Sequence, residues 1–376
     1  MEEVGERHEE VDPPKYKGWG RRNAKNLIIH ANLYVEFADV MYEGMSLIYG
    51  PPGSGKTSLA IRLASRAKGD VLWISAADSE DFFKAALERL NAPAKKFHFY
   101  HFPRTFRENI TKYVMDHGGE YSMIVVDPID GVVPQGSESA AFVHSTLYQV
   151  AQNVPVVVTS EREHRRLKYV ADHVVKVWYR INSQGHLIRY MQLVKSRRRP
   201  PGPRYIFDIV DGVGIVWIKS VERVTAENVE HVRDERLGVN TFKGAVIGVF
   251  SHNEWKLAEK IQPFLDDENS YLLVLSPFNI SRRLRAPPER VVVASSFNDF
   301  MKFIAKIYRG EIKPKYLVVT GLVPLDLLSP GDALDYLVVI GAISGTMELT
   351  IFTDVAEPSQ IKKSYVLQAM NENIFI

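Results

Sequence analysis

The sequence contains no cysteine among its 376 residues. Disulfide bonds, thiolate nucleophiles and cysteine-ligated zinc or iron–sulfur sites are therefore excluded. The chain also has little excess charge of either sign, because 47 Lys and Arg residues balance 45 Asp and Glu residues. The net charge of +2 predicts no general affinity for polyanions. No apolar run approaches the roughly 20 residues of a membrane span, and the acidic first residues lack the apolar region of a signal peptide. These absences predict a cytoplasmic protein without a membrane partner.

The most informative stretch is the octapeptide GPPGSGKT at residues 50–57. It fits the P-loop pattern G-x-x-x-x-G-K-[ST] without a mismatch and lies between a strand-like run at 45–49 and a helix-like run at 58–67. Glycines let the backbone take positive φ, so that successive N–H groups point into one hollow at the positive end of a helix and bind phosphate oxygens. The alternative is an ordinary glycine-rich turn. We expect ATP to be bound by Gly50, Pro51, Pro52, Gly53, Ser54, Gly55, Lys56, Thr57 and Ser58.

Two side chains of this stretch carry separate roles. The Lys56 ammonium is a mobile charge for the β- and γ-phosphates, and the Thr57 hydroxyl is a ligand of the type that Mg²⁺ takes in P-loop sites. Asp127 closes an apolar strand-like run about 70 residues further on, where P-loop proteins place the acid on the Mg²⁺ side. The alternative for Asp127 is a cap on the following loop. The predicted cofactors are ATP and Mg²⁺, with Thr57 and Asp127 on the metal side.

Strand-like and helix-like segments alternate from residue 45 to about 160, which predicts an α/β fold with a parallel sheet and helices on both faces. Ligands bind at the carboxyl ends of strands in such sheets, and Gly50 and Asp127 both lie at such ends. Consecutive strands from about 173 to 218 predict an antiparallel extension of the same sheet. Length alone favours two domains.

We therefore expect a flexible arm at 1–20, an ATP-binding domain at 21–218, a charged linker at 219–243 with a helix over 227–236, and a second α/β domain at 244–376. The segment order of the second domain repeats that of the first, since 245–256 matches 46–56 and 315–320 matches 121–127. Its loop has lost the glycines, Glu254 stands where phosphates would bind, and Thr320 replaces the acid. This predicts a degenerate copy lacking a P-loop; the alternative is an unrelated α/β domain.

Several segments together resemble the RecA superfamily, and within it the KaiC-like ATPases, over about residues 25–218: GPPGSGKT, VLWISAADSEDFFKAALERL, SMIVVDPIDGVV, VPVVVTSEREHRRLKYVADHVVKVWYR and LIRYMQLVKSRRRPPGPRYIFDI. The resemblance implies a RecA-like core in both halves, ATP bound with Mg²⁺, and a homo-oligomer, commonly a hexameric ring with nucleotide between subunits. It implies that Asp127 is the Walker B acid. It also implies that Lys195 and Arg197, at a K-x-R position, reach the γ-phosphate of a neighbouring subunit. From the residues alone, 195–199 is equally a solvated basic turn or a nucleic-acid contact.

One position departs from the family pattern. The family's general base is a glutamate at the end of the second strand, where this chain has Ser75-Ala76-Ala77-Asp78. Loss of such a base costs about 10²–10⁴-fold in rate. Asp78 is the candidate catalytic residue together with Lys56, and its alternative is a cap on the helix that begins near Ser79. Glu161 is a further acid near the site.

Three functions follow from these features. The first is a slow Mg²⁺-dependent ATPase whose nucleotide state controls assembly or partner binding. The second is a nucleotide-responsive scaffold or regulator without turnover. The third is a recombinase paralogue that binds DNA through loops at 128–138 and 161–168, of which only the second is basic. DNA is the less favoured partner.

Overall fold

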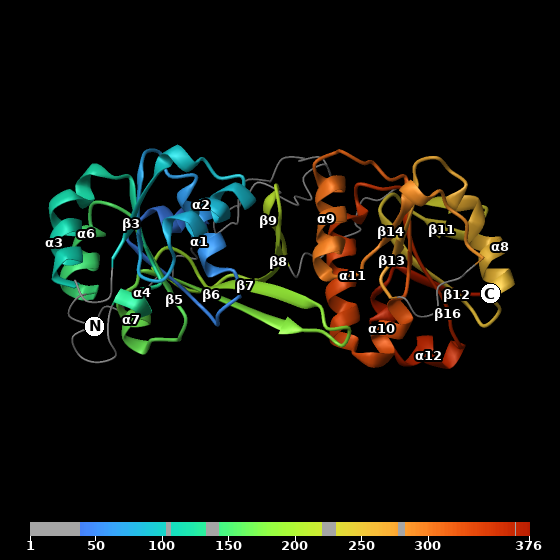
Figure 1. The fold of residues 1–376 in the computed structure, drawn as a ribbon. Helices are drawn as coiled ribbons and strands as arrows, with labels where there is room; N and C mark the ends of the chain where they lie inside the picture. Colours follow the sequence, from blue (N-terminus) through green and yellow to red (C-terminus); the bar gives the residue numbers. More distant parts are fainter. Residues whose placement is uncertain (1–37, 103–106, 133–142, 220–230, 277–282, 365) are drawn as a thin grey trace, which may run out of the picture.

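A computed structural model describes the chain except for residues 1–37, 103–106, 133–142, 220–230, 277–282 and 365. The predicted arm at 1–20 thus lies outside the described residues. The described part contains a nine-stranded sheet, a six-stranded sheet and a two-stranded hairpin, with helices packed on the faces of the two large sheets (Figure 1). The predicted α/β fold with a mostly parallel sheet core is confirmed.

The first sheet has the strand order β3-β2-β4-β5-β1-β6-β7-β8-β9. Strands β3 to β6 in this order run parallel, and β7, β8 and β9 extend the sheet in antiparallel fashion. Its strands are β1 (Met45–Tyr49), β2 (Val71–Ser75), β3 (Phe97–His101), β4 (Met123–Asp127), β5 (Val156–Ser160), β6 (His173–Ile181), β7 (Leu187–Ser196), β8 (Arg204–Val210) and β9 (Gly214–Lys219). The helices around it are α1 (Lys56–Ala64), α2 (Glu80–Arg89), α3 (Arg107–His117), α4 (Ile129–Val132), α6 (Tyr148–Val150) and α7 (Arg165–Val170).

Alternation along the buried strands builds two cores. All five residues of β1 are buried; Ile48 packs with α1 and α2 on one face, while Leu47 and Tyr49 pack with α3 and α6 on the other. Successive side chains of a strand point to opposite faces, so a continuous apolar run is what a strand covered on both sides requires. The carboxyl ends of β1, β2, β4 and β5 thereby meet at one edge of the sheet.

The second sheet has the order β14-β13-β15-β16-β12-β17, and all of its strand pairs are parallel. Numbered in chain order within each sheet, both sheets read 3-2-4-5-1-6 over their parallel strands. The second sheet comprises β12 (Ala245–Ser251), β13 (Ser270–Val274), β14 (Val291–Val293), β15 (Tyr316–Thr320), β16 (Leu349–Val355) and β17 (Glu372–Phe375). Its helices are α8 (Glu254–Leu265), α9 (Phe297–Tyr308), α10 (Leu322–Leu328), α11 (Pro330–Ser344) and α12 (Pro358–Lys363).

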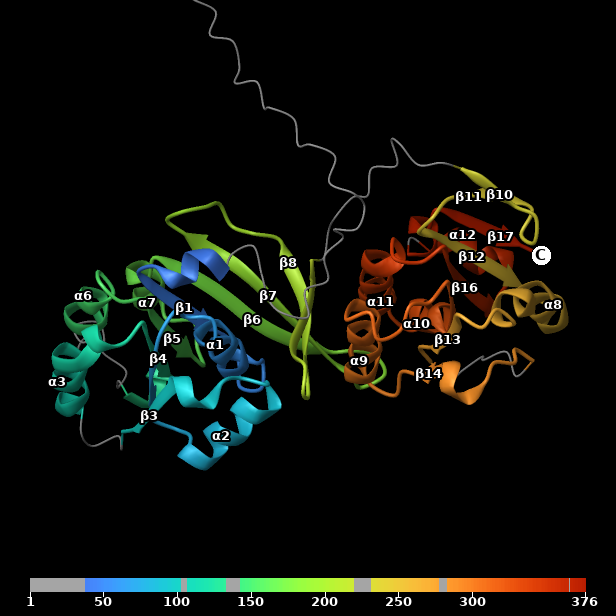
Figure 2. The same ribbon diagram turned by 90° about the horizontal axis from the view of Figure 1, so that it is seen from above.

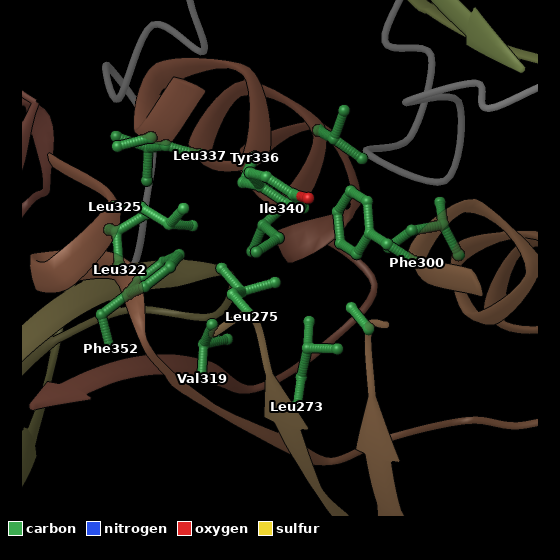
Figure 3. Close-up of a cluster of buried hydrophobic side chains, with 14 of the residues drawn as sticks. Leu273, Leu275, Phe300, Val319, Leu322, Leu325, Tyr336, Leu337, Ile340 and Phe352 are labelled. Atoms are coloured by element: carbon green, nitrogen blue, oxygen red, sulfur yellow. The ribbon is translucent and has the colours of Figure 1, made fainter. Parts of the chain in front are cut away.

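One apolar core joins the antiparallel extension to the C-terminal half. Tyr190 and Ile206 of β7 and β8 belong to the same buried cluster as Phe300 of α9 and Tyr336 of α11. Figure 2 shows α9 and α11 between β8 and the second sheet, and Figure 3 shows the part of this core that lies against the second sheet. The two halves are therefore packed through side chains, not merely tethered.

Charged groups close the junction at its edge. Arg180, near the tip of the β6–β7 hairpin, pairs with Asp332 and Asp335 of α11, and both aspartates are buried. The Tyr190 hydroxyl also donates to Asp335, and Ser183 donates its N–H to Asp332 at 2.7 Å. Buried carboxylates are stable only when they are paired in this way.

The secondary structure expected for the linker was wrong. The expected helix over 227–236 is replaced, in its described part, by strand β10 (Val232–Asp234), which pairs with β11 (Val239–Thr241). Between them, Leu237 is buried in the core beside α8, so this part of the expected linker packs on the C-terminal half. The helix-like stretch at 139–152 is helical in its described part, where a π-helical turn at Val143–Leu147 is followed by α6; residues 133–142 lie outside the described residues.

Helices α10 and α12 and strand β17 were not predicted. Helices α4 and α7 begin within the stretches expected as loops at 128–138 and 161–168. Among the described helices, none is long and apolar enough to cross a membrane.

Candidate nucleotide-binding site

The loop between β1 and α1 has the backbone of an anion-binding cup. Gly53 and Gly55 have φ values of 76° and 97°, a region that side chains strongly disfavour. Gly50 is a glycine for a different reason, because a Cβ there would lie 1.8 Å from the carbonyl oxygen of Val177 on β6. The positive φ expected of the loop glycines is therefore found at Gly53 and Gly55 and not at Gly50, whose role is close approach between strands.

The start of α1 leaves its backbone donors to a ligand. Its N-cap is Gly55, which has no side chain to accept them. The Ser54 hydroxyl is buried in the same loop and has no hydrogen-bond partner among the described residues. Pro52 and Gly53 are exposed, and a Cβ on Gly53 would meet nothing within 4 Å. Uncapped N–H groups, an orphan hydroxyl and open space fit a phosphate chain.

Lys56 is buried in this loop, with 7% of its surface exposed, and its Nζ donates to the Pro51 carbonyl oxygen at 3.0 Å. Burial lowers the pKa of the Lys56 ammonium, although the nearby carboxylates of Glu161 and Asp127 act in the opposite direction. A neutral carbonyl is a weak partner for a desolvated ammonium. The arrangement favours exchange of that carbonyl for an anionic phosphate.

Asp127 ends β4 and is 3% exposed. Burial raises the pKa of its carboxyl group, while hydrogen bonds from the Thr159 and Thr57 hydroxyls lower it and do not fully offset the burial. The structure thus brings together the two predicted metal-side residues, Thr57 and Asp127. A cation at this position would stabilise the ionised carboxylate, so the donor set fits Mg²⁺ held by one hydroxyl and one acid.

The end of β2, where the resemblance places a catalytic glutamate, carries alanines in the structure as the sequence indicates. Ala76 is buried, and a Cβ built on Gly131 of α4 would lie 2.7 Å from the Ala76 Cβ, so α4 fills the room beside it. Ala77 and Asp78 are exposed. The Asp78 N–H donates to the Ser75 hydroxyl at 2.9 Å, and the Asp78 carboxylate is close enough to Asp127 to contribute to the raised pKa of that acid.

Acids and a histidine gather beyond Asp127. Glu161, exposed after β5, donates its N–H to Asp130 Oδ2 at 2.7 Å, and His164 Nε2 lies 2.8 Å from Asp130 Oδ1. Burial raises the pKa of Asp130, but its hydrogen bonds with His164 and the Glu161 N–H outweigh burial and leave it lowered. Asp130 is therefore an anion near Lys56, and sequence reasoning missed it.

Lys195 and Arg197 lie away from the P-loop of their own chain. β7 runs antiparallel to β6, and Ser196 pairs with His173 at the start of β6, so the residues after Ser196 reach the edge of the sheet where β1 begins. Lys195 Nζ donates to three carbonyl oxygens at 2.6–2.9 Å, at the carboxyl end of α7. Arg197 is half exposed, and its Nε pairs with Asp172 Oδ1 at 2.9 Å.

A cavity of about 530 Å³ opens beside the P-loop, within the range of small-ligand sites. Its walls come from α1, from β7 and β8, and from the start of α9 in the C-terminal half: residues 53 and 55–58, Arg89, Leu187, Arg189, Asp208, Ile209, Ser296, Phe297 and Asn298. None of the residues outside the P-loop was predicted: those of α2, β7 and β8 are brought to the P-loop by the fold of the first half, and those of α9 by packing of the C-terminal half.

Comparison with known proteins agrees with this geometry. Residues 46–163 match the family described as ATPase family associated with various cellular activities (AAA). The chain is also 22% identical over 318 residues to a protein named replication factor C large subunit from Methanopyrus kandleri. That alignment covers 76% of this chain and 56% of the relative, so the chain spans little more than half the length of the relative it matches.

These comparisons support a P-loop ATPase domain of the AAA type around β1 to β5 and a distant similarity to the replication factor C subunit. They do not support the more specific resemblance to KaiC-like proteins that the sequence segments suggested.

Proposed function

We propose that this chain binds ATP with Mg²⁺ and hydrolyses it slowly, and that its nucleotide state controls assembly or contact with a partner. The observation that carries the proposal is the convergence of an uncapped helix start, the buried Lys56 and the Thr57–Asp127 pair at one sheet edge. Bound at this cup, a nucleotide would place its phosphates against the α1 N–H groups and Lys56. Mg²⁺, when bound, supplies charge neutralisation at the phosphates.

We also propose a head-to-tail homo-oligomer. Arg197 lies at the edge of the sheet where β1 begins, whereas the phosphate cup lies where β1 ends. At about 3.3 Å per residue these two ends of β1 are roughly 13 Å apart, so Arg197 cannot reach the phosphate cup of its own chain. It can serve only a neighbour whose cup faces this edge. A contact between opposite edges is heterologous and closes into a ring if the rotation allows, as a hexamer would. The name of the matched relative, a subunit of a complex, agrees with assembly.

For the C-terminal half we propose a degenerate copy of a RecA-like domain at 244–376, joined to an ATP-binding domain at 21–218. The strand order 3-2-4-5-1-6, which both sheets share over their parallel strands, supports this reading; the antiparallel extension is a feature of the first sheet. At the start of α8 the Asn253 side chain accepts the N–H groups of Trp255 and Lys256, at 2.9 and 3.3 Å. Backbone donors that a phosphate would need are therefore used by the protein itself.

A second function, a regulator without turnover, is favoured by one observation: the end of β2, where the resemblance places a catalytic glutamate, carries Ala76 and Ala77, and the acid nearest in the chain is Asp78. The DNA-binding alternative has less support. Lys168, in the basic stretch at 161–168, lies on α7 and pairs with Glu163, and the other candidate stretch lies largely outside the described residues. Screened, paired charges contribute little to backbone affinity for DNA.

Titration with Mg·ATP tests the proposal. Wild type should bind, and Lys56→Ala should weaken binding by roughly 10–100-fold, because a charge-assisted hydrogen bond contributes about 1.5–3 kcal/mol. Lys68→Ala, an exposed residue just beyond α1, is the matched control and should bind as wild type. Equal affinities for all three proteins would refute nucleotide binding at this loop. A measurement of phosphate release then distinguishes the slow ATPase, which releases phosphate, from the regulator without turnover, which does not.

A further inference from the structure

The cavity beside the P-loop has a wall that belongs to the C-terminal half. Ser296, Phe297 and Asn298, at the start of α9, line it together with residues 55–58 of α1. Because α9 packs on β7 and β8 through the shared apolar core, this wall is held in place and does not depend on a loop.

A chain of hydrogen bonds runs along that wall to the phosphate cup. Asn298 Nδ2 donates to Asp208 Oδ2 at 2.9 Å and to the Ile209 carbonyl oxygen at 2.8 Å. Asp208, 1% exposed, pairs through its other oxygen with Arg189, and Arg189 Nε donates to the Gly53 carbonyl oxygen at 3.4 Å. Three side chains thus connect the C-terminal half to the glycine loop.

The chemistry of the wall differs from that of the cup. The cup offers backbone N–H groups and an ammonium, which suit phosphates. The cavity offers the guanidinium groups of Arg89 and Arg189, the apolar Ile209 and Phe297, and the amide of Asn298. Planar cations and apolar side chains bind the faces of a base, and an amide can hydrogen-bond its edge or a ribose hydroxyl.

We propose that Asn298 is a nucleotide-positioning residue: with Asp208 and Arg189 it forms the wall against which the base and ribose of the nucleotide bind, so the C-terminal half is part of the nucleotide site and responds to its occupancy. This rests on the proposed binding of ATP at the P-loop. The proposed contact joins the C-terminal half, which lacks a P-loop, directly to the ligand. Nucleotide binding can thereby change the conformation or contacts of the C-terminal half.

Two ligands distinguish binding at the wall from binding at the cup: ATP has a base and ribose, and inorganic tripolyphosphate has neither. Asn298→Ala should weaken ATP binding roughly tenfold, as loss of a hydrogen bond and its network would, and leave tripolyphosphate binding unchanged. Lys56→Ala should weaken both ligands. Lys302→Ala, further along α9 where its side chain pairs with Asp299, is the matched control and should weaken neither.

Hydrogen exchange of the wild-type chain provides a test without substitutions. ATP should slow exchange of the amides in the first turns of α9, and tripolyphosphate should not. If Asn298→Ala weakens the binding of both ligands equally, the inference fails and ATP binding stands. The same holds if ATP does not slow hydrogen exchange in α9 while Lys56→Ala still weakens ATP binding. If Lys56→Ala changes neither ligand, the proposed function itself fails.

Discussion

Asp354, on β16, accepts a hydrogen bond from the Thr320 hydroxyl on the neighbouring strand β15 at 2.9 Å. In the first sheet the acid, Asp127, is on β4 and its hydroxyl partner, Thr159, is on β5. By strand order β15 corresponds to β4 and β16 to β5, so acid and hydroxyl have exchanged strands. Asp354 also accepts the N–H groups of Gly321 and Val323 at 2.6 and 2.9 Å, which makes it the cap of α10. An acid used in this way is not available to a metal ion.

Asp354 predicts a pH dependence of stability. Burial raises the pKa of its carboxyl group to about 6, against hydrogen bonds from Val323, Gly321 and Thr320 that lower it. Between the ordinary aspartate pKa of about 4 and this value, the folded state holds a proton that the unfolded state releases, so stability falls as pH rises across that window and levels off above it. The loss attributable to Asp354 is roughly 3 kcal/mol, at about 1.4 kcal/mol per pKa unit.

Urea unfolding of wild type and Asp354→Asn at about pH 4 and about pH 7 measures this term. The amide keeps one of the two acceptor oxygens and does not ionise, so wild type should lose stability relative to the variant as pH rises. Asp116→Asn, at an exposed position of α3, should track wild type. A constant difference between wild type and Asp354→Asn at both pH values would contradict the assignment.

A glutamate introduced at the end of β2 should increase ATP hydrolysis. Ala77 is exposed, whereas Ala76 is packed against Gly131, so only Ala77 has room for a longer side chain. Ala77→Glu should raise Mg·ATP hydrolysis at least about tenfold, because general bases contribute about 10²–10⁴-fold. Asp78→Ala should lower the slow wild-type rate, and Asp81→Ala, in the first turn of α2, should not. Phosphate release at saturating ATP is the measurement; no response to either Ala77→Glu or Asp78→Ala would favour the regulator without turnover.

The parts of this structure that the sequence predicted are those specified locally. The apolar runs that became β1, β2, β4 and β5 are buried on both faces, and the glycine loop sits between a strand and a helix as its pattern requires. The pairing of Thr57 with Asp127 followed because α1 begins just after the carboxyl end of β1, and Asp127 lies at the carboxyl end of β4 on the same edge of the sheet.

What the sequence did not predict depends on contacts between distant segments. Asn298 reaches Asp208 across 90 positions of the chain, and no spacing rule connects them. The hairpin at 232–241 is short and charged, and it is held by Leu237 in the core and by the Arg236 guanidinium, which stacks 3.8 Å from the Phe264 ring. Tertiary packing overrides weak local propensity in such segments.

The position of Arg197 predicts complementation between subunits. In a head-to-tail oligomer, one subunit supplies the phosphate cup and its neighbour supplies the arginine. Arg197→Ala should therefore lower hydrolysis by about 10³-fold, the lower end for an arginine acting in trans, and leave the affinity for ATP nearly unchanged. The neighbouring Arg198, which pairs with Glu43 at 2.7 Å, provides the matched control, and Arg198→Ala should keep its activity.

Mixing makes the test specific to assembly. Lys56→Ala subunits lack a working cup and keep Arg197, whereas Arg197→Ala subunits have the reverse defect, so each is inactive alone. Mixed oligomers contain interfaces with an intact cup facing an intact arginine, and hydrolysis should rise above that of either protein by itself. The Ala77→Glu background would enlarge the signal. An arginine acting within its own chain, or one held permanently by Asp172, gives no recovery on mixing, and that outcome would remove the proposed arrangement.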